Sequence, residues 1–224
     1  MCGRYSLTTP VEALRRLFRF EQLPNLAPRY NIAPTQQAPV VRPSGAGREI
    51  VHLRWGLVPS WAKEIAGAPL INARGESVVE KPSFRNAFAK RRCLVPADGF
   101  YEWQARPDGG KQPWRIGRRD GEAFAFAGLW ESWRAPDGAN IESFTIVTAS
   151  ANGDLAPLHD RMPVILATGD HDLWLRAAAP RADILALLRP FPANELQAYA
   201  VSTRVNKVAN DDAACIAPLA ASLV

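Results

Sequence analysis

Cys2 has the most distinctive chemical setting of any residue in this 224-residue chain. If the initiator Met1 is removed, Cys2 carries a free α-amine and a thiol on adjacent carbons, with reference pKa values of about 7.7–8.0 and 8.5. Such an aminothiol can attack an aldehyde through nitrogen and close the adduct through sulfur, giving a five-membered thiazolidine. It can also act as an N-terminal thiol nucleophile on an acyl group. Gly3 allows a sharp bend beside the nucleophile, and the cation of Arg4 is expected to lower the pKa of the thiol.

Two polar residues stand inside apolar or aromatic sequence and could assist this nucleophile. Asn72 follows an apolar pair, and it is either a turn residue or helix cap or an amide that orients the reacting groups. Glu102 lies between Tyr101 and Trp103 in an expected strand. Partial burial there would raise the pKa of the carboxyl and suit it to proton transfer, whereas an exposed edge-strand carboxylate is an equally good interpretation.

His159 lies in a polar turn ahead of an apolar run, where catalytic groups often occur, although a single histidine is more often incidental. The other two histidines, His52 and His171, are expected to be structural or solvated. The aromatic segment 55–61 has no titratable group. It is expected either to pack in the core or to form an apolar platform on which nucleobases stack.

Hydrophobic periodicity predicts short helices and a larger number of strands. The helices are expected at 11–18, with Thr9-Pro10 as N-cap and first helical residue, at 76–80, 83–90 and 182–188, and at 170–178 with Asp170 as a cap. The strands are expected at 39–42, 50–55, 92–95, 99–104, 114–116, 123–130, 144–148, 164–166 and 198–201. Glycine-containing turns at 43–47, 106–110 and 136–138 have hairpin length, so the pattern favours a mainly antiparallel α+β fold.

The composition is that of a globular chain able to bury a full core, with 47% hydrophobic and 22% charged residues. The chain shows no apolar run long enough to span a membrane and no secretory signal, so a cytoplasmic protein is expected. Cys2, Cys93 and Cys215 are irregularly spaced, which suits a reducing compartment and gives no metal-binding pattern. A net charge of +5 and a pI near 9.4 favour an anionic partner.

Several long blocks together resemble the SOS-response-associated peptidase (SRAP) family. The matching blocks are MCGRY at 1–5, NIAPTQ with PVV within 31–41, WGLVPSW at 55–61, NARGE at 72–76, SFRNAF at 83–88, RRCLVPADGFYEW at 91–103 and HDRMPVIL at 159–166. The resemblance implies one SRAP-like domain over 1–224, with a barrel-like, mainly antiparallel core and flanking short helices. The region from about Asp170 onward is the least characteristic part.

The resemblance also implies a reaction, in which the family captures abasic sites in single-stranded DNA. The nucleophile falls on Cys2, which forms a thiazolidine with the aldehyde of the ring-opened deoxyribose. Asn72 is implied to position the reacting groups. Glu102 is implied to assist proton transfer, and His159 is implied to act on the sugar hydroxyl, on the Schiff base and on reversal.

DNA contacts are implied for the arginines of the same motifs. Arg4, Arg74, Arg85 and Arg161 would clamp phosphates around the lesion, while Trp103 and the segment 55–61 are weaker candidates for base stacking. The expected partner is therefore single-stranded DNA with abasic sites, bound by a monomer that is associated with the nucleoid when on DNA. No metal or organic cofactor is expected.

Three alternatives remain open at this stage. An N-terminal-nucleophile amidohydrolase would use Cys2 on an amide carbonyl and would need an oxyanion hole. A peptidase, as the family name suggests, would remove its own Met1, and an AP-lyase activity could accompany the cross-link. A non-catalytic reader of modified DNA bases would tolerate loss of the thiol.

Overall fold

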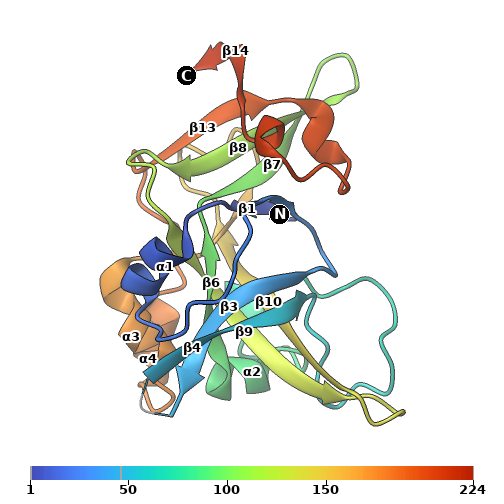
Figure 1. The fold of residues 1–224 in the computed structure, drawn as a ribbon, viewed down its shortest axis with the longest axis vertical. Helices are drawn as coiled ribbons and strands as arrows, with labels where there is room; N and C mark the ends of the chain where they lie inside the picture. Colours follow the sequence, from blue (N-terminus) through green and yellow to red (C-terminus); the bar gives the residue numbers. More distant parts are fainter. Residues whose placement is uncertain (1, 46, 224) are drawn as a thin grey trace.

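A closed barrel of five strands forms the lower part of the computed structural model, which describes residues 2–45 and 47–223 (Figure 1). In order around the ring, the strands are β4 (Gly47–Trp55), β3 (Gln37–Ser44), β6 (Arg92–Ala97), β9 (Phe124–Arg134) and β10 (Asn140–Ser150). The strand β10 pairs with both β9 and β4, which closes the ring. All neighbouring pairs are antiparallel except β10 with β4, which is parallel.

Three short strands extend the barrel sheet around β9 and β10. They are β5 (Asn72–Arg74), which runs parallel to β10, β11 (Arg161–Pro163), which is antiparallel to β10, and β12 (Ile165–Leu166), which pairs with β9. Two of the segments singled out in the sequence, around Asn72 and just after His159, therefore both pair with β10. The first runs parallel to it and the second antiparallel.

A second sheet of six strands lies above the barrel (Figure 1). Its order is β14 (Pro218–Leu223), β13 (Leu196–Val201), β8 (Lys111–Arg118), β7 (Gly99–Ala105), β1 (Tyr5–Leu7) and β2 (Arg29–Ile32). The chain passes from the barrel to this sheet at Asp98, between β6 and β7. The N-terminal strand β1 lies between β2 and β7, so the residues beside Cys2 are held in the interior of a sheet.

The helices are short and flank the sheets. They are α1 (Val11–Phe18), α2 (Arg85–Lys90), α3 (His171–Leu175) and α4 (Arg181–Ala186), with single 3-10 turns at Gly75–Ser77, Thr168–Asp170, Thr203–Asn206 and Ala213–Cys215. In α1 the buried side chains are Leu14 and Phe18, four residues apart on one face of the helix. Among the described residues, no helix has the length and apolar character needed to cross a membrane.

The core has two parts, one on each face of the second sheet. The larger cluster fills the barrel and reaches Tyr5, whose ring packs edge-on against Trp55 and Phe126 with centroid separations of 5.1 and 5.9 Å. The smaller cluster consists of the fully buried Tyr101, Val201, Val205 and Cys215, with Trp103 packed against it. The period of two along a strand places neighbours such as Tyr101 and Glu102 on opposite faces.

The predicted fold class, a mainly antiparallel α+β fold with a barrel-like core and short helices, is confirmed. The three predicted hairpin turns join β3 to β4, β7 to β8, and β9 to β10. No pattern in the sequence predicted β1, β2, β5, β11 and β14, or the parallel pairings of β10. The predicted helix at 76–80 is only a 3-10 turn, Gly75–Ser77.

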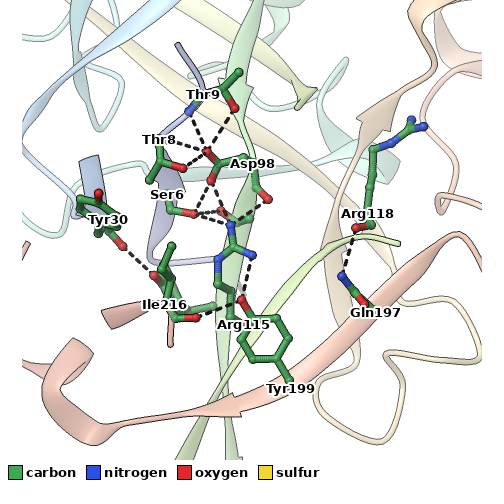
Figure 2. A network of polar contacts seen from close by, with 12 residues as sticks. Ser6, Thr8, Thr9, Tyr30, Asp98, Arg115, Arg118, Gln197, Tyr199 and Ile216 are labelled. Atoms are coloured by element: carbon green, nitrogen blue, oxygen red, sulfur yellow. Dashed lines mark hydrogen bonds and ion pairs between the residues drawn. The ribbon is translucent and has the colours of Figure 1, made fainter. Parts of the chain in front are cut away.

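The predicted cap of α1 is wrong, because Pro10 and not Thr9 occupies its N-cap position. Asp170 occupies the N-cap position of α3 as predicted, but its side chain makes no capping hydrogen bond. Thr9 instead donates its backbone N–H and its hydroxyl to Asp98 Oδ2, at 3.1 and 3.3 Å (Figure 2). A carboxylate from a distant part of the chain therefore takes the groups that a local cap would have used.

Candidate active site

Cys2 lies immediately before β1 and is fully buried. Its carbonyl oxygen accepts a hydrogen bond from Asn72 Nδ2 at 2.8 Å, and its Sγ lies 3.9 Å from the carbonyl oxygen of Arg4. Asn72 is the first residue of β5, where pairing with Ile146 of β10 fixes its backbone. The amide thus holds the main chain of Cys2 from a strand that begins 70 residues later.

The thiol of Cys2 is neutral at pH 7. Burial raises the pKa of the thiol far above its ordinary value, and the negative charge of Glu102 raises it further. The expected lowering of this pKa by Arg4 is wrong. The Nη1 atom of Arg4 instead donates to Asn31 Oδ1 and to the carbonyl oxygen of Val205, both at 2.8 Å. A neutral thiol must lose its proton as it reacts, so the site needs a base beside it.

Glu102 lies on β7 with only 4% of its surface exposed. Burial raises the pKa of this carboxyl from 4.5 to about 7, and the charge of Asp160 acts in the same direction. A carboxyl group with a pKa near 7 is present in both protonation states at neutral pH. It can therefore accept a proton in one step and donate it in another.

His159 lies in the turn before β11, with 29% of its side chain exposed. Its Nδ1 accepts a hydrogen bond from the backbone N–H of Arg161 at 3.0 Å and lies 2.8 Å from Asp160 Oδ1. Burial lowers the pKa of the imidazole, while the charge of Asp160 opposes that effect. The N–H of Arg161 favours the neutral tautomer with its proton on Nε2.

The four predicted catalytic residues are connected to one another. Asn72 binds the backbone of Cys2, the charge of Glu102 acts on the thiol of Cys2, and Asp160 acts on both Glu102 and His159. They come from four segments that the sequence separates by 30 residues or more. The structure thus brings together a thiol, an amide, a titrating carboxyl and an imidazole.

Two predicted phosphate contacts lie on strands beside this group. Arg74 is exposed at the end of β5. Arg161 is held in place by Glu76, with distances of 2.5 Å from Nη1 to Oε1 and 2.9 Å from Nη2 to Oε2. Its Nη2 also donates to the carbonyl oxygen of Thr148 at 2.8 Å. A fixed guanidinium of this kind presents its charge in a defined direction.

Arg4 and Trp103 lie against each other beside the smaller core cluster. The guanidinium carbon of Arg4 is 5.8 Å from the ring centroid of Trp103. The indole Nε1 of Trp103 donates to Asn206 Oδ1 at 2.7 Å. Because Trp103 follows Glu102 along β7, its side chain leaves the sheet on the face opposite to the carboxylate.

The remaining predicted DNA contacts lie elsewhere. Arg85 is exposed on α2, where it lines a pocket together with Phe88, Arg92 and Ile184. Trp55 is fully buried in the core and donates its Nε1 hydrogen to the carbonyl oxygen of Ile71 at 3.0 Å, so it cannot stack on a base. Trp61, in the same segment, is 64% exposed.

Sequence reasoning missed a clasp between β2 and the segment 205–211. The side chain of Asn31, fully buried, donates to the carbonyl oxygens of Val205, Lys207 and Asn210. Asp211 pairs with Arg29 and accepts the backbone N–H of Asn31 at 2.9 Å. Because Asn31 and Val205 also bind Arg4, the clasp fixes the segment that carries Cys2. The NIAP sequence was a visible signal, but its partners are about 180 residues away.

No group of three or more histidine, cysteine, aspartate or glutamate side chains within the described ranges is arranged to hold a metal ion.

Comparison with known proteins places this chain in a family. The SOS response associated peptidase (SRAP) family matches residues 1–208, and the chain belongs to that family. It is 41% identical over 216 residues to the Abasic site processing protein YoqW of Bacillus subtilis (strain 168), with 94% of this chain and 96% of that protein covered. It is 32% identical over 266 residues to the Abasic site processing protein HMCES of Gallus gallus, with 98% and 78% covered.

A solved structure confirms the fold. The crystal structure of a protein from Bacteroides thetaiotaomicron is 26% identical to this chain, with a TM-score of 0.87 and coverage of 97% of this chain and 100% of that one. The clasp residue Asp211 lies beyond the part of the chain that the family matches.

Proposed function

We propose that this protein processes abasic sites in DNA by capturing the opened sugar covalently through Cys2. The observation that carries the proposal is the contact of Asn72 with the backbone of Cys2, together with a buried carboxyl of raised pKa beside the thiol. The names of the relatives YoqW and HMCES support the same substrate. The capture requires the free amine of Cys2 and therefore removal of Met1, which lies outside the described residues.

The first chemical step opens the sugar ring. In the closed abasic sugar, the C1′ hydroxyl loses its proton, the bond between C1′ and O4′ breaks, and O4′ takes up a proton, which leaves an aldehyde at C1′. In this proposal His159, whose pKa is lowered by burial, takes part in the proton transfer at the sugar hydroxyl. Glu102 in its protonated form supplies a proton to the leaving oxygen.

The second step forms the ring that links protein and DNA. The amine of Cys2 adds to the aldehyde and expels one water molecule, which gives an imine. The sulfur of Cys2 then adds to the imine carbon at an intramolecular effective concentration. Its proton passes to the carboxylate of Glu102 and from there to the nitrogen, so that the net loss is one water.

The DNA is held, in this proposal, by Arg74 and Arg161 beside the reacting groups, with Arg4, Arg85 and Trp103 as further contacts. Phosphate contacts release counterions, so binding should weaken steeply with salt and should depend little on base sequence. A single strand is the expected form of the substrate, because it can bend into the site without the cost of breaking base pairs. The protein is expected to act as a monomer.

Intact mass spectrometry tests the proposal directly. Protein that lacks Met1 is mixed with a single-stranded oligonucleotide containing one abasic site. The expected product has the sum of the two masses minus one water and survives denaturing electrophoresis. Cys2→Ala should abolish it, whereas Cys93→Ala, which removes an equally buried thiol from the barrel, should retain it.

Other results would favour the alternatives. Retention of the covalent product in Cys2→Ala would contradict the proposed nucleophile. Turnover of glutamine in the absence of DNA would indicate an amidohydrolase. Tight, saturable binding of modified DNA with no covalent product in any variant would indicate a reader.

A further inference from the structure

A slot of about 400 Å³ opens between the second sheet and the loop that leads to His159. Its walls come from β8, β13 and the residues before His159. The lining is mostly hydrocarbon and aromatic and includes Gln104, Trp114, Leu155, Pro157, Leu158 and Ala198. None of the groups assigned to the chemistry above belongs to this lining.

The strand register places the slot beside the reactive carboxyl. Trp114 of β8 is directly opposite Glu102 of β7, and it is also opposite Ala200 of β13. Directly opposed residues of antiparallel strands project from the same face, with Cβ atoms about 4.5–5.5 Å apart. Leu158, on the other wall, is the residue before His159. The slot therefore borders both proton-transfer groups.

Trp114 is oriented with its ring faces uncovered by other rings. Its Nε1 donates to Gln104 Oε1 at 3.1 Å, and the Nε2 of the same glutamine donates to the carbonyl oxygen of Pro157 at 3.5 Å. The first bond lies along the edge of the indole, so it fixes the ring without occupying its face. Over the described ranges, neither an aromatic ring nor a cation stacks on this tryptophan.

The chemistry of the lining suits a flat, uncharged heterocycle. Leu155, Leu158 and Ala198 supply apolar contact, and the amide of Gln104 can offer a donor and an acceptor at the edge. The charged residues Arg119 and Asp154 also line the slot. Unstacked bases of single strands are bound in this way, by stacking on an aromatic ring and hydrogen bonding along their edges. A captured sugar at Cys2 has a neighbouring nucleotide on each side, so a base is covalently tethered close to the slot.

We propose that the slot formed around Trp114 binds the nucleobase of one nucleotide adjacent to the abasic sugar. This inference rests on the proposed function. Stacking of the base on Trp114 would hold the strand so that the opened sugar faces Cys2 and Glu102. The slot would accept any base, because stacking uses the flat face that all bases share.

A binding cycle tests the proposal. Non-covalent affinity is measured in a Cys2→Ala background with oligonucleotides that carry an abasic-site analogue and, on one side or the other, either a normal nucleotide or a spacer without a base. Removing the base from one side should weaken binding about 5- to 100-fold, the range expected for one base stacked on an aromatic ring. Trp114→Ala should cause the same loss with the normal strand and no further loss with the spacer. Trp114→Phe should recover part of the affinity.

The controls separate this proposal from the reaction itself. Trp130→Phe, a change at a half-buried tryptophan on the barrel strand β9, should behave as the parent protein. The covalent product at saturating DNA, measured with Cys2 intact, reports on the capture reaction whether or not the slot is used. The slot proposal would be overturned if Trp114→Ala weakened the affinity equally for the normal strand and for the strands with a spacer on either side. It would also be overturned if Trp114→Ala caused no loss of affinity. An unchanged affinity would point to another occupant, such as an apolar peptide side chain.

Discussion

Asp98 and Glu102 lie four residues apart in one segment, and their carboxyl groups behave in opposite ways. Both are buried, with 8% and 4% of their surface exposed. The pKa of Asp98 is nevertheless held below its ordinary value, while the pKa of Glu102 is raised to about 7. Burial alone therefore does not decide the charge of either group.

The surroundings of Asp98 explain its permanent charge (Figure 2). Burial would raise its pKa, but this effect is outweighed by hydrogen bonds and by a cation. Ser6 Oγ donates at 2.7 Å, Thr8 donates both its N–H and its hydroxyl, and Arg115 Nη2 lies 3.1 Å from Oδ1. Gly99 leaves room for this guanidinium, because a Cβ there would lie 2.5 Å from its central carbon.

At Glu102 burial prevails, and the charge of Asp160 adds to it. The comparison shows how two nearby positions in one segment can serve two purposes. Asp98 is an ionised anchor that joins β1 and β8 to the start of β7. Glu102, on β7, keeps a proton that it can exchange near neutral pH.

The largest expected effect is on the reaction rate of Glu102→Gln. The amide has nearly the same shape but cannot exchange a proton, so formation of the covalent product should slow by about 10²-fold or more. Single-turnover kinetics with an abasic oligonucleotide measures this rate. Asp98→Asn, assayed at a temperature where it is folded, should form the covalent product at a rate within a few-fold of that of the parent protein. Equal losses in both variants would show that the two carboxyl groups do not differ in the proposed way.

The next effect is on the stability of Asp98→Asn. Removing one partner of a buried ion pair leaves Arg115 uncompensated, and the free energy of unfolding should fall by about 3–5 kcal/mol. Chemical denaturation at pH 7 measures the change. Asp183→Asn, at an exposed position on α4, should change it by less than about 0.5 kcal/mol. If the free energy of unfolding fell by as little as in the control, the hydrogen bonds and ion pair of Asp98 would contribute little to stability.

The two carboxyl groups should also give opposite pH dependences of stability. A carboxyl whose pKa is raised on folding, from 4.5 to about 7 at Glu102, costs stability as pH rises through that window, on the order of 3 kcal/mol. Asp98, with a lowered pKa, stabilises the fold above its unfolded pKa and loses this contribution in acid.

His171 contributes a third pH dependence. Because burial lowers its pKa to about 4, the fold gains stability as pH rises from 4 to 6.5.

The contribution of Glu102 is isolated by comparing unfolding free energies of the parent and Glu102→Gln from pH 4 to 8. The variant should become relatively more stable as pH rises, because it lacks the carboxyl that resists ionisation. A constant difference across the range would mean that the pKa of Glu102 is not raised.

The smallest expected effect comes from Asp160→Asn. The side chain of Asp160 is 85% exposed, so water and salt screen its charge. Loss of that charge should lower the pKa of both Glu102 and His159 and move the pH–rate profile to lower pH, with a change of only a few-fold at any one pH. The shift should shrink as salt is added. A profile that moves to higher pH would contradict the assigned direction.

The sequence singled out candidate residues but did not predict their contacts. Cys2 could be singled out by its place after Met1, and His159 by its place in a turn ahead of an apolar run. Asn72 and Glu102 could be singled out because polar groups are rare inside apolar or aromatic segments. The contact of Asn72 with the carbonyl of Cys2, rather than with a helix end, depends on the pairing of β5 with β10. Parallel pairing between distant segments has no local signature in the sequence.

The errors have the same physical origin. Thr9 was predicted as a helix cap, and Arg4 as a cation that lowers the thiol pKa. Asp98 and Asn31, which are 89 and 27 residues away, take these groups instead. Local rules assume that a side chain uses its nearest partner, and the tertiary fold supplies partners that no local rule includes. Long strands such as β9 were predictable because an apolar run depends on neighbours along the chain.

The clasp between Asn31 and the segment 205–211 has a consequence for biosynthesis. During translation Cys2 emerges before Val205, which fixes Arg4 and lies 201 positions after it along the chain. Domains generally fold as units during synthesis, so the surroundings of Cys2 can be completed only after the segment 205–211 has left the ribosome. A nascent chain would thus display Cys2 without the contacts that hold it in the fold and, under the proposed function, would become competent for capture only when the fold is complete.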